Sequence, residues 1–162
     1  MAEDEALARE PGQKTRRPRD ELGQLLPWDA ENRLQLEDFD SLPLEENHRL
    51  GREHFNAGRF FPAHEAWETA WKQARETEDE EFYKGLSQLG AGYTHYRRGN
   101  PHGTHTLMRR GLSRISRYGS AHGGIDVAAL VEVVEGQATE VERAEGAGEQ
   151  MPPIEPPAIR SA

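Results

Sequence analysis

Three stretches of the chain repeat apolar residues at intervals of three and four positions. They cover residues 86–93, 107–115 and 127–141, with polar residues between the apolar ones. These intervals place the apolar side chains on one face of an α-helix, which has about 3.6 residues per turn. Nowhere does the pattern alternate at every second residue, as it does in a half-buried strand. The pattern therefore predicts an all-α fold.

Helix boundaries follow from prolines, glycines and polar caps. Pro62 and Pro101 suit the first turn of a helix, where the amide hydrogen that proline lacks has no partner. Asn100 and Asp126 are good N-caps. Glycines suited to helix C-terminal caps are Gly58, Gly99 and Gly119. These signals predict five helices, near residues 45–57, 62–76, 80–98, 101–118 and 127–145. Because the connections are short, we expect a compact bundle of antiparallel helices, or stacked helical hairpins.

Composition divides the chain into three parts. Residues 1–43 carry many charges and few large apolar side chains, and residues 146–162 are rich in proline and glycine. Neither segment offers enough apolar surface to offset the entropy lost on ordering. We therefore expect a mostly disordered N-terminal arm, a helical domain at residues 44–145 and a disordered C-terminal tail.

The overall composition narrows the possible classes of protein. Of 162 residues, 35% are hydrophobic and 30% are charged, and the mean hydropathy is -0.90. The absence of cysteine excludes a disulfide scaffold, a thiolate nucleophile and cysteine-ligated zinc or iron–sulfur sites. The chain starts with acidic residues rather than a signal peptide, and no apolar run approaches the roughly 18 residues that span a bilayer. We expect a soluble cytoplasmic protein that does not enter a membrane.

The densest group of aromatic residues surrounds a histidine and two glutamates. On the helix expected at 62–76, His64, Glu68 and Trp71 share one face, with Trp67 beside them. Burying an indole stabilises the fold by about 2–3 kcal/mol, so the tryptophans should turn this face inward. A buried Glu68 then needs a histidine, an arginine, a metal or a proton as its partner. The expected core aromatics are Phe55, Phe60, Phe61, Trp67 and Trp71.

The helix expected at 80–98 offers partners for this group. Gln88 and His95 are seven residues apart and share a face with small neighbours that allow close approach. If the two helices pack antiparallel, a polar pocket forms from His64, Glu65, Glu68, Gln88 and His95, with Asn100 nearby. Three roles stay open: a hydrogen-bond network that fixes how the helices dock, a metal site, or direct small-ligand or acid–base work. The sequence identifies no catalytic residue, resident metal or cofactor.

Charge is spread unevenly along the chain. The formal net charge is -9, yet residues 82–125 contain seven lysines and arginines and no acid. Internal neutralisation, for example by the acidic helix at 127–145, is one interpretation. The other is a surface for RNA or another anion, with His102 and His105 at the start of the basic helix. The residues that would form this surface are Arg109, Arg110, Arg114 and Arg117.

A longer motif joins these elements. It reads Phe55-Asn56-x-Gly58-x-Phe60-Phe61-x-x-His64-Glu65-x-Trp67-Glu68-x-x-Trp71, followed by Gly85-Leu86-x-Gln88-Leu89 and His95-x-x-x-Gly99-Asn100-x-x-Gly103. The motif resembles a bacterial family catalogued as domain of unknown function 309, over about residues 44–118. This resemblance implies a small all-helical fold whose function is uncharacterised.

These residues favour a binding or interaction module that uses the His/Glu pocket to hold an unidentified small ligand or protein. One alternative is a metal-dependent hydrolase or acid–base enzyme, which needs His95 close to Glu68 and an opening to solvent. The other is RNA or anion binding through the arginine-rich fourth helix, which needs the arginines to form one exposed stripe.

Overall fold

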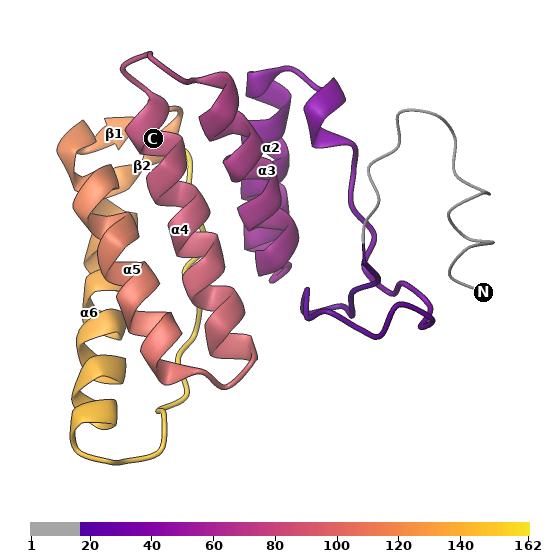
Figure 1. The fold of residues 1–162 in the computed structure, drawn as a ribbon. Helices are drawn as coiled ribbons and strands as arrows, with labels where there is room; N and C mark the ends of the chain where they lie inside the picture. The colour runs from indigo at the N-terminus through magenta and orange to yellow at the C-terminus, as the bar shows by residue number, and fades with distance from the viewer. Residues whose placement is uncertain (1–16) are drawn as a thin grey trace. The chain divides into compact units, whose positions relative to one another are not determined.

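The structure, a computed structural model, describes residues 17–162 and confirms the all-α prediction (Figure 1). The helices in this part of the chain are α2 (Leu44–Asn56), α3 (Phe60–Gln73), α4 (Glu80–Arg97), α5 (Pro101–Ile115) and α6 (Val127–Gly146). The short elements are the 3-10 helices η1 (Phe39–Ser41) and η2 (Ser116–Tyr118) and the strands β1 (Ala121–His122) and β2 (Ile125–Asp126). The two strands pair antiparallel, and at two residues each they are too short to show an alternating pattern in the sequence.

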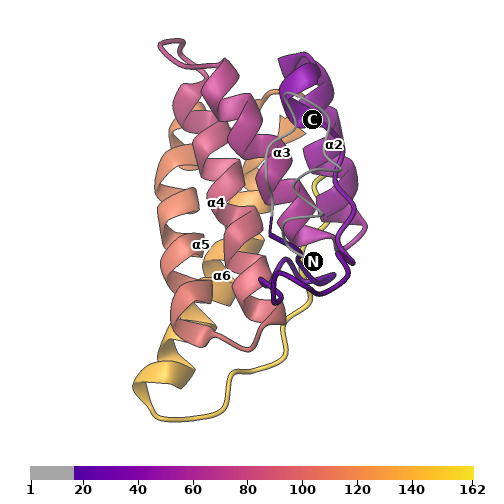
Figure 2. The ribbon, with the colours of Figure 1, turned by 45° about the vertical axis from the view of Figure 1, so that its right-hand side comes forward.

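Each helix packs against its neighbours in the chain. α2 contacts α3, α3 contacts α4, α4 contacts α5, and α5 contacts α6. Figures 1 and 2 show these helices side by side, running alternately up and down. The helical hairpins expected from the short connections are therefore present.

Local signals place the helix ends close to the expected positions. Asn100 and Asp126 cap α5 and α6, since each side chain accepts a hydrogen bond from the backbone nitrogen three residues on, at 3.3 and 3.0 Å. Gly58, after α2, has a φ of 78°, a left-handed conformation that carries a steric penalty for other residues. α3 begins at Phe60, slightly earlier than the sequence predicts, and Pro62 lies within its first turn.

Glycines allow α4 and α5 to approach closely. An added Cβ at Gly111 would lie 2.8 Å from the carbonyl oxygen of Gly85, and one at Gly85 would lie 3.1 Å from that of Gly111. The two backbones are therefore in contact where the helices cross. Nearer the start of α5, an added Cβ at Gly103 would lie 2.6 Å from the ring of His95, so the His95 ring packs directly on the α5 backbone.

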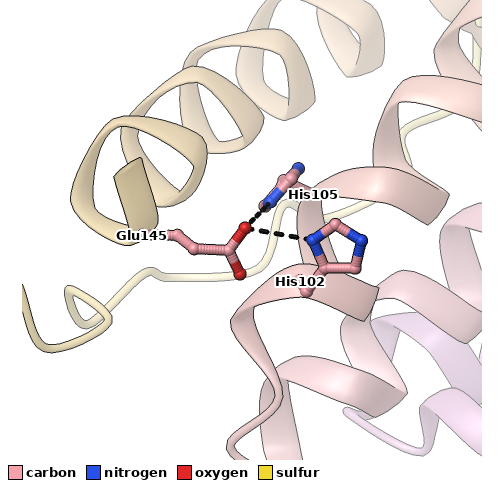
Figure 3. Close-up of side chains that lie close together, drawn as sticks. All are labelled: His102, His105 and Glu145. Carbon is pink, nitrogen blue, oxygen red and sulfur yellow. Dashed lines mark hydrogen bonds and ion pairs between the residues drawn. The ribbon is translucent and has the colours of Figure 1, made fainter. Parts of the chain in front are cut away.

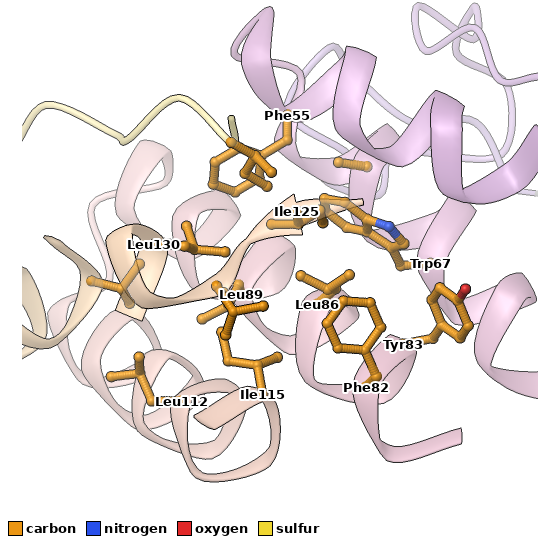
Figure 4. Packing of buried hydrophobic residues seen from close by; sticks show 14 of the residues in the cluster. Phe55, Trp67, Phe82, Tyr83, Leu86, Leu89, Leu112, Ile115, Ile125 and Leu130 are labelled. Atoms are coloured by element: carbon orange, nitrogen blue, oxygen red, sulfur yellow. The ribbon is translucent and has the colours of Figure 1, made fainter. Parts of the chain in front are cut away.

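The core has an aromatic centre. The ring of Phe55 lies 5.0 Å from that of Phe60 and 5.4 Å from that of Tyr93, measured between centroids. Figure 4 shows Phe55 and Trp67 among the aliphatic residues that complete the cluster. Of the core aromatics expected from the sequence, the buried ones are Phe55, Phe60 and Trp67, and the partly buried ones are Phe61 and Trp71.

The segment after α6 packs against the helices, whereas its composition predicts a disordered tail. Ile159 is only 3% exposed, and its backbone makes two hydrogen bonds with the side chain of Asn56 on α2, at 2.7 and 3.0 Å. The backbone nitrogen of Ile154 donates to the hydroxyl of Tyr96 at 2.9 Å. Figure 1 shows this tail, in yellow, running back along the helices. A few isolated apolar residues suffice here because helix side chains satisfy the tail backbone.

The residues before α2 fall into two parts. Residues 17–37 are the described part of a separate unit, in which Asp20 accepts a hydrogen bond from the backbone nitrogen of Leu22 at 2.9 Å. The helical unit begins at Asp38, and Asn47 of α2 donates to the carbonyl of Phe39 at 2.9 Å. The first 16 residues of the arm expected from the sequence lie outside the described residues.

A half-buried histidine, His48, joins the β-hairpin to the helices. The Nδ1 atom of His48 accepts a hydrogen bond from the indole nitrogen of Trp67 at 3.1 Å, and Nε2 donates to the carbonyl of Gly123 at 2.7 Å. An indole nitrogen only donates, so Nδ1 is unprotonated and the neutral ring uses both nitrogens. Burial lowers the pKa of His48, and this effect outweighs the opposite effect of the Gly123 carbonyl.

We expect His48 to make the fold less stable in mild acid. Its folded-state pKa lies below the ordinary value of 6.5, so the unfolded chain binds this proton more readily. The contribution of His48 to stability is complete above pH 6.5 and falls as the pH falls toward the folded-state pKa. Urea unfolding at about pH 8 and about pH 5 should therefore show a smaller pH effect for His48→Gln than for the unchanged protein. Equal pH effects would show that another group is responsible.

Candidate functional site

One turn of α3 gathers three potential ligand side chains. His64, Glu65 and Glu68 each offer one nitrogen or oxygen atom, and these three atoms lie within 4.8 Å of one another. The spacing of four residues puts His64 and Glu68 on one face of the helix, with 3.3 Å between Nε2 and Oε2. Their side chains are 24% and 32% exposed, so the group lies half-buried at the domain surface.

Ser87 on α4 fixes the orientation of the His64 ring. The Ser87 hydroxyl donates to the backbone carbonyl of His64 at 3.1 Å. The backbone carbonyl oxygen and the hydroxyl oxygen of Ser87 each lie 2.9 Å from Nδ1 of His64. Because the hydroxyl proton is already donated, both oxygens act as acceptors here, and Nδ1 carries a proton. Gly90 permits this contact, because an added Cβ there would lie 3.0 Å from the backbone nitrogen of His64. Nε2 is thus the nitrogen that faces Glu68.

The pair of His64 and Glu68 shifts the pKa of both groups. The hydrogen bond with His64 lowers the pKa of Glu68 to about 2, against the effect of burial. Burial alone lowers the pKa of His64, but the hydrogen bonds with Glu68 and Ser87 outweigh it, and the pKa is raised overall. Lys72 makes a further ion pair with Glu68 at 3.3 Å. The environment of Glu68 therefore favours a cation beside it.

The other residues of the expected pocket bond elsewhere. Gln88 accepts a hydrogen bond from Arg114 on α5 at 3.2 Å. Nδ1 of His95 accepts from the Asn100 amide at 3.0 Å, since the Asn100 oxygen already caps α5. The structure thus brings His64, Glu65 and Glu68 together without His95. Gln88 is hydrogen-bonded to Arg114, and Asn100 to His95.

Two partly buried aromatic residues flank the cluster on α3. The ring centroid of Phe61 lies 6.0 Å from that of His64, and the guanidinium of Arg98 lies 5.9 Å from the Phe61 centroid. At the other end, the ammonium of Lys84 lies 4.8 Å from the ring centroid of Trp71. Lys84 belongs to α4 and Arg98 directly follows it, so this part of the chain supplies positive charge on either side of an acidic cluster.

A second cluster lies where the start of α5 meets the end of α6. Figure 3 shows His102 and His105 directed at the same carboxylate oxygen of Glu145, at 3.0 and 2.9 Å. These hydrogen bonds, that of His105 foremost, lower the pKa of Glu145. The sequence pattern associates the two histidines only with an anion surface. Their spacing of three residues was the available signal, but it does not reveal which residue of α6 faces them.

The four arginines of α5 and η2 differ in whether they pair with a carboxylate. Arg109 lies 3.4 Å from Glu142 of α6, and Arg114 lies 2.7 Å from Glu81 of α4, each distance joining a guanidinium nitrogen to a carboxylate oxygen. The exposed ones are Arg110 and Arg117. Internal neutralisation therefore accounts for two of the four arginines, and the four do not form a uniform cationic stripe for a nucleic acid.

The fold and these clusters define a class: an all-helical domain with histidine–carboxylate groups between adjacent helices and on their surfaces. Residues 48–107 match the family model described as Domain of unknown function (DUF309), in agreement with the family resemblance that the motif predicts. The match is shorter than the 44–118 expected from the motif; it includes His102 and His105 and ends before Glu145. No curated protein and no solved structure was found to match. Among the described helices, none is long and apolar enough to cross a membrane.

Proposed function

We propose that the protein is a metal-binding module in which His64, Glu65 and Glu68 hold a divalent transition metal ion. The main support is the contact with Ser87, whose carbonyl accepts a hydrogen bond from Nδ1 of His64 and so leaves Nε2 facing Glu68. This function is a more specific form of the binding module that the sequence favours.

The donor set suits such an ion. Imidazole and carboxylate ligands are used by zinc, manganese and iron(II). A metal-ligating histidine usually donates its other ring N–H to a carbonyl or carboxylate, and Ser87 supplies a carbonyl here. Ligand atoms about 2.0–2.1 Å from a tetrahedral ion lie about 3.3 Å from one another. The 3.3 Å between His64 and Glu68 is close to that spacing, so binding needs little movement of either side chain.

Charge also favours a cation at this place. Two neighbouring carboxylates repel each other, and a divalent ion between them would offset that repulsion. Lys72, which now pairs with Glu68, is 56% exposed and can turn toward solvent when an ion binds. Because the cluster is only half-buried, water or a group from a binding partner can complete the coordination.

Calorimetric titration of metal-free protein with Zn²⁺ and with Mn²⁺ tests this function. The background is a His102→Asn, His105→Asn variant, which removes the second histidine cluster. We expect Glu68→Gln to lower the metal affinity at least about tenfold, because glutamine keeps the shape of the side chain but lacks its charge. The matched control is Glu46→Gln on α2, where the glutamate pairs with Arg49 outside the site; it should bind like the background.

Two results would contradict a metal-binding function. One is an affinity that Glu68→Gln leaves unchanged. The other is no metal binding by the background protein together with a lower melting temperature in Glu68→Gln. That second result would assign the cluster to the hydrogen-bond network that docks α3 on α4.

A further inference from the structure

We propose a second metal site at the junction of α5 and α6, where His102, His105 and Glu145 hold a divalent transition metal ion (Figure 3). This site shares no residue with the α3 cluster. Two imidazoles and one carboxylate are a ligand set that zinc uses in proteins, with the fourth position left to water or substrate. Zinc is therefore the ion we expect it to prefer.

The ligand atoms already converge. Nδ1 of His102 and Nε2 of His105 lie 3.0 and 2.9 Å from one oxygen of Glu145, and the three ligand atoms lie within 4.8 Å of one another. Around a tetrahedral zinc ion, neighbouring ligand atoms are about 3.3 Å apart. The nitrogens and the oxygen therefore need to separate by only a few tenths of an ångström to admit the ion.

Local structure explains this convergence. Asn100 caps α5 and starts the helix, so the histidines two and five residues later stand in its first turns. Residues three apart on a helix share a face, which brings the rings of His102 and His105 to 5.2 Å between centroids. α6 runs antiparallel to α5, and Glu145 in its last turn therefore lies opposite this face.

Glu142 places a second carboxylate near Nδ1 of His105, the ring nitrogen that does not face Glu145. Nδ1 of His105 lies 3.9 Å from Glu142, one turn before Glu145 on α6. A guanidinium nitrogen of Arg109 lies 3.4 Å from a carboxylate oxygen of Glu142. Arg109 also donates a 2.8 Å hydrogen bond to the hydroxyl of Thr139. When Nε2 of His105 binds a metal, Nδ1 carries the ring proton, and Glu142 is placed to accept it after a small rotation. Such carboxylate–histidine–metal chains are typical of zinc sites.

The two histidines differ in exposure, which suggests how the ion enters. The side chain of His105 is 11% exposed and that of His102 is 75% exposed. His105 and Glu145 thus form the fixed side of the site, and His102 closes it from the solvent side. Water can occupy the remaining position on that open side.

An ion at this site would join two segments of the chain that are 40 residues apart, His105 and Glu145. It would fasten the start of α5 to the end of α6, next to the point where the tail leaves α6. A ligand that binds only the folded state stabilises it by mass action. At a zinc concentration about 100 times Kd, the melting temperature of a chain this long should rise by about 5–10 °C.

Thermal unfolding of the metal-free protein with and without Zn²⁺ tests the site. The background is Glu65→Gln, Glu68→Gln, so that the α3 cluster does not contribute. We expect Glu145→Gln to abolish the rise in melting temperature, while glutamine keeps an oxygen for the two histidines and preserves the metal-free fold. The matched control, Glu149→Gln, removes an exposed glutamate that pairs with Arg143 and should keep the full rise.

Counting bound Zn²⁺ separates this site from the α3 cluster. With both sites present we expect two ions per chain, with one lost in Glu145→Gln and the other in Glu65→Gln, Glu68→Gln. A single ion that only Glu145→Gln removes would contradict the proposed function and leave this site standing. A zinc-induced rise that persists in Glu145→Gln, or the absence of any rise in the background protein, would overturn the inference.

Discussion

Replacing Trp67 with alanine is expected to lower the free energy of unfolding by about 3–5 kcal/mol. The side chain is fully buried, and its indole fills the space over Gly51, where an added Cβ would lie 2.5 Å from the ring. Truncation leaves a large cavity between α2 and α3. It also leaves the partly buried Nδ1 of His48 without its donor. Urea unfolding followed by far-ultraviolet circular dichroism measures the loss.

The matched control is Trp71→Ala, four residues further along α3. Trp71 is only partly buried, and the ammonium of Lys84 lies over its ring, so its removal opens the surface instead of the core. We expect a loss of about 1 kcal/mol. Equal losses in the two variants would contradict the distinct positions of the two indoles.

Replacing Ile159 with alanine is expected to cost about 2 kcal/mol or more. The tail buries this residue in the core, and its backbone bonds with Asn56 hold it there. A disordered tail, as the composition predicts, would show no such loss. The same urea experiment distinguishes the two arrangements.

Val133→Ala is a suitable control for the tail prediction. Val133 is a large apolar residue that is 41% exposed on α6, so its truncation should change the free energy of unfolding by no more than about 0.5 kcal/mol. A chain that ends at residue 150 should lose at least as much stability as Ile159→Ala. Full stability of this shortened chain would contradict the packing of the tail.

The helices could be predicted because their signals are local. A cap such as Asn100 bonds to a backbone nitrogen three residues away, and the apolar stripe of a helix repeats within each turn. The tail could not be predicted in this way. Ile154 and Ile159 have no periodic pattern around them, and their backbone partners, Tyr96 and Asn56, are distant in the sequence.

The candidate site was predictable within one helix and not between helices. The closeness of His64 and Glu68 follows from their spacing of four residues. For the contact between α3 and α4, the sequence predicted Gln88, whereas the residue that contacts His64 is its neighbour Ser87. One residue changes the direction of a side chain by about 100° around the helix axis. Small neighbours on α4 indicated a close approach but not its register.

By itself the sequence determined five helices, their caps and the cluster within one turn of α3, because each of these depends on residues a few positions apart. Only the tertiary structure decided that Ser87 orients His64, that Glu145 meets His102 and His105, and that the tail covers the core. Those contacts depend on the register and rotation of whole helices, which are set by the packing of many side chains at once.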